Sequence, residues 1–242
     1  MSASSHNMPP LALLSGGLGT RLGSLAAQTP KALIEVAGRP FLAHQLELLV
    51  SQGIREVVIC CGHLGKAIEA FAGDGHSFGC RIQYSDDGPE LLGTGGAIRK
   101  ALPLLGSEFW VMYGDTYLTA QFVTVLDTFR KEQKPACMAV LRNENLWDTS
   151  NVEFVNGSLV RYSKQRRTLA MRHIDYGLSL FSTEAFRNWE DIRAFDLSQL
   201  QEQLTEQGKM AACEVHERFY EIGTPSALRE TENFLQNLEV RA

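Results

Sequence analysis

The 242-residue chain lacks the hallmarks of several protein classes. Its five cysteines include no Cys-x-x-Cys pair and its six histidines show no metal-ligand spacing, which excludes the common zinc motifs. No apolar run approaches the length of a membrane span, and the N-terminus lacks a signal-peptide pattern. We therefore expect a protein of the reducing cytoplasm with free thiols and no membrane partner.

An excess of positive charge is also absent. The formal net charge is −5, which excludes a general nucleic-acid binder. Any site for anions must then gather its positive charge locally. The apolar content of 44% is enough for a sizeable core. We predict that residues 1–10, which are polar and end in proline, form a disordered leader, and that residues 11–242 form a single domain.

Strand-like and helix-like patterns alternate through the first half of the chain. Apolar runs typical of buried strands alternate with helical stripes that continue to residue 131. This rhythm predicts an α/β fold with a doubly wound, mostly parallel sheet, whose first half spans residues 11–141. The strands are expected at 11–14, 57–61, 81–84, 109–113 and 136–141, and the helices at 41–52, 65–71, 97–105 and 121–131.

The second half, residues 142–242, has a different pattern. Asn156-Gly157 lies between two strand-like runs, 152–155 and 159–162, and predicts a β-hairpin. A further strand is expected at 174–181. Helices are predicted after Thr183 and after Thr224, since both are suitable N-caps. A third helix is predicted after Asp196, where Leu197, Leu200 and Leu204 recur at helical spacing.

The most informative stretch follows the first predicted strand. Gly16, Gly17 and Gly19 allow backbone N–H groups to reach a phosphate, and Arg21 and Lys31 add positive charge. A P-loop is excluded because Lys-Ser/Thr does not follow the glycines. A dinucleotide fingerprint is excluded because its third glycine is missing. A plain surface turn is the remaining alternative, and the co-occurrence of strand, glycines and cations favours phosphate binding instead.

This stretch resembles the signature of the sugar-1-phosphate nucleotidyltransferases, with Gly-Gly-Leu-Gly-Thr-Arg-Leu at 16–22 and Pro-Lys at 30–31. The resemblance runs from about Leu11 onward. It implies a Rossmann-like nucleotidyltransferase fold and a reaction of the EC 2.7.7 class, in which an NTP and a sugar 1-phosphate give an NDP-sugar and pyrophosphate. It also implies that Arg21 and Lys31 are catalytic. The predicted nucleotide-binding residues here are Ser15, Gly16, Gly17, Gly19 and Thr20. Ser15 stands where the family more often has Ala.

Two carboxylates are candidates for holding Mg²⁺. Asp115 follows a glycine at the end of a predicted strand, where open α/β sheets bind ligands. The resemblance assigns it to Mg²⁺ and to catalysis. Glu221 precedes Ile-Gly-Thr-Pro in the C-terminal third, where the family usually has Asp. A turn cap for Asp115 and a surface position for Glu221 are the structural alternatives.

A second glycine-rich turn occurs at residues 93–96. Gly95 and Gly96 open a predicted helix, and bare N–H groups at a helix N-terminus suit a base, a ribose or a phosphate. In the family this loop packs on the nucleotide. The alternative is a turn with a purely structural role.

The predicted sugar side lies after the hairpin. The resemblance places Lys164 near the sugar phosphate, with Ser163 replacing the usual Glu. Asp175 and Gly177 fall where relatives carry Asn-x-Gly and contact the sugar. The departure at Asp175 leaves the sugar open.

The expected substrates are best matched by the small guanylyltransferases, which use GTP with D-glycero-D-manno-heptose 1-phosphate or mannose 1-phosphate. Uridylyltransferases acting on amino-sugar 1-phosphates in cell-wall recycling are the alternative. Transfer to a phosphate such as phosphocholine and a non-catalytic nucleotide-sugar sensor are further possibilities on the same fold. The C-terminal helix is a candidate contact for a homodimer.

Overall fold

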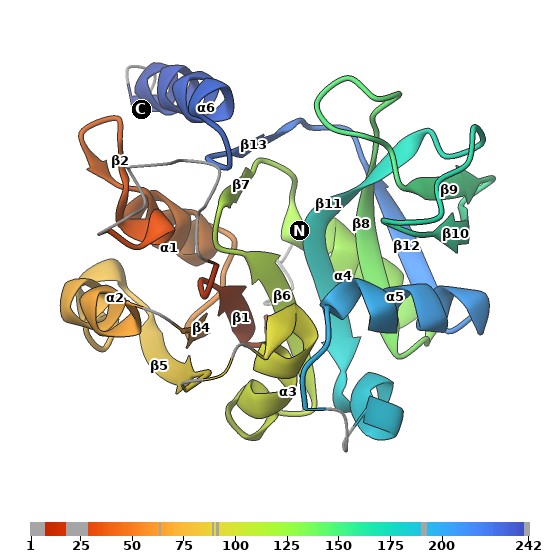
Figure 1. The fold of residues 1–242 in the computed structure, drawn as a ribbon, viewed down its shortest axis with the longest axis horizontal. Helices are drawn as coiled ribbons and strands as arrows, with labels where there is room; N and C mark the ends of the chain where they lie inside the picture. Colours follow the sequence, from red (N-terminus) through yellow and green to blue (C-terminus); the bar gives the residue numbers. More distant parts are fainter. Residues whose placement is uncertain are drawn as a thin grey trace, which may run out of the picture.

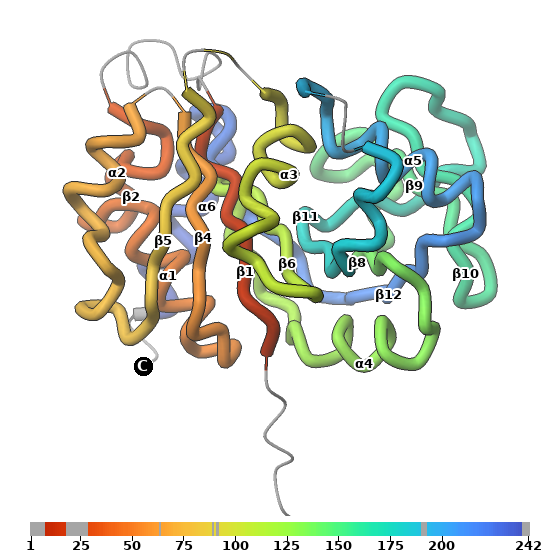
Figure 2. Tube along the Cα trace, turned by 90° about the horizontal axis from the view of Figure 1, so that it is seen from below, coloured from red at the N-terminus to blue at the C-terminus, as the bar shows by residue number. Residues whose placement is uncertain are grey.

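The computed structural model describes residues 8–17, 29–62, 64–88, 90, 92–189 and 193–239. A large sheet runs through the middle of the molecule in the order β10-β9-β11-β6-β1-β4-β5, and β8 and β12 extend it from β11 (Figure 1). Its first-half strands are β1 (Leu11–Leu14), β4 (Glu56–Cys61), β5 (Arg81–Asp86) and β6 (Glu108–Tyr113). These four strands are parallel and lie side by side (Figure 2).

The direction of pairing changes between β6 and β11. β11 (His173–Ser182) is antiparallel to both β6 and β8 (Ala136–Arg142), and β12 (Met210–Val215) is parallel to β8. The predicted hairpin is present as β9 (Val152–Val155) and β10 (Ser158–Tyr162). The sheet is thus parallel over β5, β4, β1 and β6 and mixed elsewhere, and β8, at the end of the predicted first half, lies in the mixed part.

Helices cover both faces of the sheet. One face carries α1 (Phe41–Ser51), α2 (Gly65–Ala72) and α4 (Phe122–Glu132), and the other carries α3 (Gly93–Leu105) and α5 (Leu197–Glu206). Cys60 packs on the second face and Cys61 on the first, which confirms that adjacent strand residues point to opposite sides. α6 (Pro225–Glu239) covers the shorter elements near α1.

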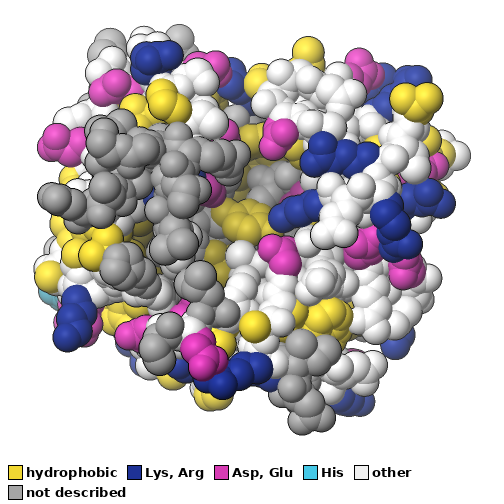
Figure 3. Space-filling view, in the orientation of Figure 1, with side chains coloured by type: hydrophobic (Ala, Val, Ile, Leu, Met, Phe, Trp, Pro, Cys, Tyr) yellow, Lys and Arg dark blue, Asp and Glu magenta, His cyan; other side chains and the backbone are white. Residues whose placement is uncertain are grey.

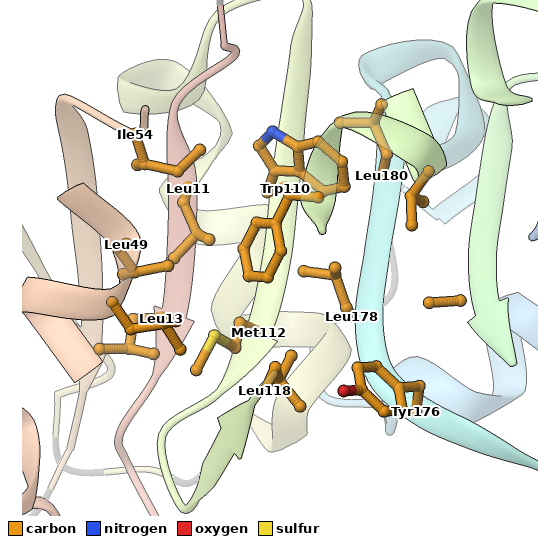
Figure 4. Close-up of a cluster of buried hydrophobic side chains, with 14 of the residues drawn as sticks. Leu11, Leu13, Leu49, Ile54, Trp110, Met112, Leu118, Tyr176, Leu178 and Leu180 are labelled. Atoms are coloured by element: carbon orange, nitrogen blue, oxygen red, sulfur yellow. The ribbon is translucent and has the colours of Figure 1, made fainter. Parts of the chain in front are cut away.

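The core of the first face is built from strand residues that alternate with those of the opposite face. Leu11 and Leu13 of β1 and Trp110 and Met112 of β6 are fully buried there, with Leu178 of β11 beside them (Figure 4). Because β1 is covered on both faces, its run is apolar throughout, as parallel strands require.

Several short elements complete the fold. β2 (Glu35–Val36) pairs with β3 (Arg39–Pro40), and β7 (Thr116–Leu118) pairs antiparallel with β13 (Phe219–Glu221). The described part of the chain also contains the 3-10 helices η2 (Lys31–Leu33), η3 (His76–Phe78) and η4 (Thr183–Trp189). Among the described residues no helix combines the length and the apolar character needed to cross a membrane.

The structure corrects some predicted boundaries. α3 begins at Gly93 rather than at residue 97 and runs through Pro103 to Leu105. The segment after Thr183 is a 3-10 helix. Pro10, assigned to the leader, accepts a hydrogen bond from the Trp110 N–H (2.9 Å), so its backbone belongs to the sheet. The helix predicted after Asp196 is confirmed, and Asp196 is its N-cap, because its side chain accepts from the Ser198 N–H (2.8 Å).

Candidate active site at the carboxyl edge of the parallel strands

The parallel strands bring three predicted segments to one edge of the sheet. The last residue of β1, Leu14, is paired with Cys60 of β4 and Tyr113 of β6. Ser15 and Gly114 follow directly, and they stay hydrogen bonded across the strands: Ser15 N–H to Cys60 O (2.8 Å) and Gly114 N–H to Leu14 O (2.9 Å). This edge is where open α/β sheets bind ligands.

Gly114 is required by this close approach. A Cβ at that position would lie 2.5 Å from Ser15 Oγ and 2.7 Å from Leu14 O. Any larger residue would therefore push apart the ends of β1 and β6, and with them the glycine turn and Asp115. The hydroxyl of Ser15 has no hydrogen-bond partner among the described residues.

The glycine turn is open in the part that the structure describes. No described atom lies within 4 Å of a Cβ built on Gly17, and Gly17 is exposed. A Cβ on Gly16 would make only ordinary contacts, the nearest being Gly62 N at 3.4 Å. Gly19, Thr20 and Arg21 lie outside the described residues, so their predicted roles stay predictions.

Lys31 and Asp115 form an ion pair at this edge. The Lys31 Nζ donates to Asp115 Oδ2 at 2.6 Å, and the side chains are 13% and 32% exposed. The two residues are 84 positions apart in the sequence. Because the pair is partly shielded from water, its attraction is stronger than that of a surface pair. Two residues predicted separately as catalytic are thus in direct contact.

The turn that carries Asp115 is fixed from two sides. Gln45 of α1 is fully buried, and its Nε2 donates to Thr116 O (2.8 Å) and to Tyr113 O (3.2 Å). From the other side, the Ile222 N–H donates to Asp115 O (2.9 Å). Sequence reasoning missed Gln45, since a glutamine in a helical stripe carries no signal of a partner 68 or 71 residues away.

Glu221 lies beside Asp115 because β13 pairs with β7. Glu221 is opposite Thr116 in the register, one residue from Asp115. The ribbon therefore brings the backbones of the two predicted metal ligands close together. Carboxylate oxygens are the donors that Mg²⁺ prefers, and Asp115 already accepts a cation, the Lys31 ammonium. The donor set thus fits Mg²⁺. Within the described residues, three or more His, Cys, Asp or Glu side chains do not gather at any one point.

The second glycine turn is filled by protein. The N–H groups of Gly95 and Gly96 donate to Phe195 O at 2.9 and 3.3 Å. A Cβ on Gly95 would overlap the Phe195 ring, and one on Gly96 would lie 2.7 Å from Arg193 O. These glycines are needed for packing against residues 193–195. The predicted contact of this turn with a nucleotide stays a prediction.

Two of the predicted sugar-side residues, Lys164 and Gly177, lie next to Tyr113, the last residue of β6. Lys164, which is exposed, donates from Nζ to the Tyr113 hydroxyl at 3.5 Å and lies 5.4 Å from the ring centroid. Gly177 has φ +87°, and a Cβ there would lie 3.4 Å from Tyr113 Cδ2. Asp175 accepts from the Gly177 N–H (3.0 Å) and from the Tyr162 hydroxyl (3.3 Å). Burial raises the pKa of Asp175, while Lys164 opposes that shift.

Asp87 borders the glycine turn from the end of β5. Its Oδ2 lies 3.5 Å from the position of a Cβ on Gly16, and its Oδ1 is buried without a hydrogen-bond partner among the described residues. Burial raises the pKa of Asp87 to about 6, although Lys100 counteracts this. In the sequence, Asp86, Asp87 and Glu90 lie just upstream of the second glycine turn, which predicts that they border the site of the nucleotide base. That contact with the base stays a prediction.

Seen in the orientation of Figure 1, the surface of the molecule has a hollow near its middle (Figure 3). Hydrophobic side chains form part of its floor, and basic and acidic side chains stand at its rim. This arrangement suits a ligand that presents both a flat apolar part and charged groups.

The profile of the family described as nucleotidyl transferase matches residues 12–148, more than half of the chain. The chain belongs to this family. The match includes the open glycine turn, Lys31, Asp115 and the second glycine turn, whereas Lys164, Asp175, Gly177 and Glu221 lie beyond it. The predicted enzyme class is confirmed at the level of nucleotidyl transfer.

Two relatives of this nucleotidyl transferase illustrate its range. The D-glycero-alpha-D-manno-heptose 1-phosphate guanylyltransferase of Campylobacter jejuni is 28% identical over 213 residues, covering 88% of this chain and 94% of the relative. The N-acetylmuramate alpha-1-phosphate uridylyltransferase of Neisseria meningitidis is 39% identical over 117 residues, covering 48% of this chain and 51% of the relative.

The fold is shared with HddC from Yersinia pseudotuberculosis. That crystal structure superposes with a TM-score of 0.81, at 21% identity, over 94% of this chain and 100% of HddC. The predicted Rossmann-like nucleotidyltransferase fold is therefore confirmed.

Proposed function

We propose that this nucleotidyl transferase moves a nucleotidyl group from an NTP to a sugar 1-phosphate, giving an NDP-sugar and pyrophosphate. The observation that carries the proposal is the Lys31–Asp115 pair, held beside an open glycine turn at the carboxyl edge of the parallel strands. The turn offers backbone donors to phosphates, and the pair offers one charge of each sign.

In this reaction an oxygen of the sugar phosphate attacks the α-phosphorus of the NTP in line. A new P–O bond forms, the bond to the bridging oxygen breaks, and pyrophosphate leaves with the electron pair. The nucleophile is already an anion, so no side chain has to remove a proton. The protein's task is to position the reactants and to offset their negative charge.

Each predicted residue has a role in that scheme. Lys31 reaches the α-phosphate or the sugar phosphate, and Arg21 holds the leaving phosphates. The backbone of Gly16 and Gly17 approaches the triphosphate. Lys164 contacts the sugar phosphate, and Asp175 accepts hydrogen bonds from sugar hydroxyls.

Asp115 and Glu221 would hold Mg²⁺, because Asp115 directly precedes β7 and Glu221 lies opposite Thr116 at the end of β13. When bound, the cation screens the repulsion between two anionic reactants. The protein's contribution is to hold both carboxylates at the sheet edge.

We propose GTP as the nucleotide, with D-glycero-D-manno-heptose 1-phosphate or mannose 1-phosphate as the acceptor. Support comes from the Campylobacter relative, which matches almost its whole length to this chain. Uridylyl transfer to an amino-sugar 1-phosphate is the second candidate. It is favoured by the higher identity of the Neisseria relative over its shorter match.

The test is pyrophosphate release in a panel of five NTPs and several sugar 1-phosphates with Mg²⁺. We expect release with GTP and a heptose or mannose 1-phosphate, and none with Asp115→Asn. Asp127→Asn on α4 is the matched control, since it removes a carboxylate outside the proposed site. Release with UTP alone would replace the first candidate by the second. A folded protein that binds an NTP and releases no pyrophosphate with any pair would contradict catalysis and favour a sensor.

A further inference from the structure

We propose that Thr231, a buried residue of α6, is a positioning residue for Glu221, the second predicted metal ligand. The proposal rests on the metal site of the proposed function. Neither the sequence pattern nor the resemblance to the family singles out this threonine.

The first observation is a hydrogen bond between the helix and the strand. The Thr231 hydroxyl lies 2.6 Å from the Glu221 backbone oxygen, and the residue is fully buried. The same Oγ1 lies 2.9 Å from Ala227 O, the carbonyl four residues earlier in its own helix. A hydroxyl has one proton, so it shares that proton between the two carbonyls, and the distance to Glu221 O is shorter.

The second observation concerns what holds Thr231 in place. α6 packs through Leu235 onto Val36, Phe41 and Ile222, all of which are buried. Val36 and Phe41 belong to the segment that follows Lys31, and Ile222 follows Glu221. The threonine therefore sits on a helix anchored to elements next to Lys31 and Glu221, so its hydroxyl has a fixed position.

The third observation is the path of the Glu221 side chain. A Cβ on Gly223 would lie 3.0 Å from Glu221 Oε2, so the carboxylate lies over the place where residue 223 has no side chain. Glu has one more methylene than Asp, and its side chain loses more rotational freedom when it is ordered. A fixed backbone carbonyl at residue 221, together with the bare Gly223, limits where this longer side chain can place its oxygens.

The backbones around Asp115 and Glu221 are then held by two different helices. Gln45 of α1 fixes the turn of Asp115, and Thr231 of α6 fixes the strand of Glu221. The Ile222 N–H to Asp115 O bond joins the two. Partners that orient metal ligands commonly change metal affinity about 10-fold to 100-fold when they are removed.

The test compares Thr231→Val, which keeps the shape and removes the hydroxyl, with Thr231→Ser, which keeps the hydroxyl. Mn²⁺ serves as the probe, and its binding to the nucleotide-free and GTP-loaded protein is measured by electron paramagnetic resonance. We expect about tenfold weaker Mn²⁺ binding for Thr231→Val and near wild-type binding for Thr231→Ser. The Mg²⁺ concentration for half-maximal rate should rise in parallel, with a smaller change in kcat at saturating Mg²⁺.

Thr205→Val is the matched control. Thr205 is also buried in a helix and donates to the carbonyl four residues earlier, Gln201 O (2.7 Å), but it lies in α5 on the opposite face of the sheet. It should alter stability without altering Mn²⁺ binding. Should Thr231→Val fail to fold, Thr231→Ala removes the same hydroxyl with less bulk.

Unchanged Mn²⁺ binding in a folded variant without the hydroxyl would overturn the proposal. Equal effects of the Val and Ser variants, or an equal effect of Thr205→Val, would also overturn it. Absence of pyrophosphate release by the wild type would contradict the proposed function instead, since the Mn²⁺ comparison does not depend on turnover.

Discussion

The two glycine-rich turns have similar sequences and different surroundings. At the first turn, Gly17 faces no described atom within 4 Å, and the neighbouring Asp87 keeps a carboxylate oxygen without a partner among the described residues. At the second turn, Gly95 and Gly96 donate to Phe195 O and leave no room for a side chain. Glycine at the first turn leaves its backbone uncovered by any described residue, whereas glycine at the second allows the protein itself to pack there.

The largest effect is expected from the charges beside the open turn. Lys31→Met and Asp115→Asn should each lower kcat about a thousandfold, because each removes a charge from a preorganised site. Pyrophosphate release measures this. The double variant should lose far less than the product of the two losses, since the partners share one interaction. Multiplicative losses would show that the pair does not act as a unit.

A substitution in the second glycine turn, which protein atoms fill, should lower the stability of the fold. Gly95→Ala should lower the free energy of unfolding by about 3 kcal/mol, because the new methyl group overlaps the Phe195 ring. Urea unfolding monitored by circular dichroism gives this value. Adding Phe195→Leu should recover part of the loss. A change below about 0.5 kcal/mol would contradict the idea that this turn is filled by protein.

Asp87 should make the open turn sensitive to pH. Its pKa of about 6 lies above the value of 3.8 for an ordinary aspartate, because burial disfavours the charged form. The folded state therefore binds the proton more tightly, and stability decreases as the pH rises from about 4 to about 6. Asp87→Asn should stabilise the protein by about 1 kcal/mol at pH 7 and leave it unchanged at pH 4. Thermal unfolding at both pH values tests this. A stabilisation that is the same at pH 4 would contradict a titrating Asp87.

The smallest change in stability is expected at Gly17. Its φ is outside the left-handed region, so Gly17→Ala should alter the free energy of unfolding by less than about 0.5 kcal/mol. The KM for the NTP should nevertheless rise, since a methyl group blocks the approach of phosphate to the backbone. An unchanged KM would remove the contrast between the two turns.

The elements with strong local signals were predicted well. Apolar strand runs, the Asn156-Gly157 hairpin and the helix after Asp196 depend on residues close together in the sequence, and all are present. The start of α3 was placed four residues late, because glycines disfavour helix and only the contact with Phe195 reveals why they are there.

Long-range contacts were the part that the sequence left open. The β7–β13 ribbon joins residues about 100 positions apart, and neither three-residue strand has a periodic pattern long enough to detect. Gln45 and Thr231 act through backbone carbonyls that any residue supplies, so no motif marks their partners. Lys31 and Asp115 were easier to predict. Lys31 follows a proline in the family's signature, and Asp115 follows a glycine at the end of an apolar strand run.

The contact between Lys31 and Asp115 means that each charge already has a counterion before any reactant arrives. Folding has removed part of the water around both groups, so a substrate does not have to strip it away. An incoming ligand must therefore replace the Lys31–Asp115 ion pair. It has to provide an anion for Lys31 and a cation for Asp115 together. A phosphate that arrives together with a metal ion meets both demands, whereas either one alone meets only half.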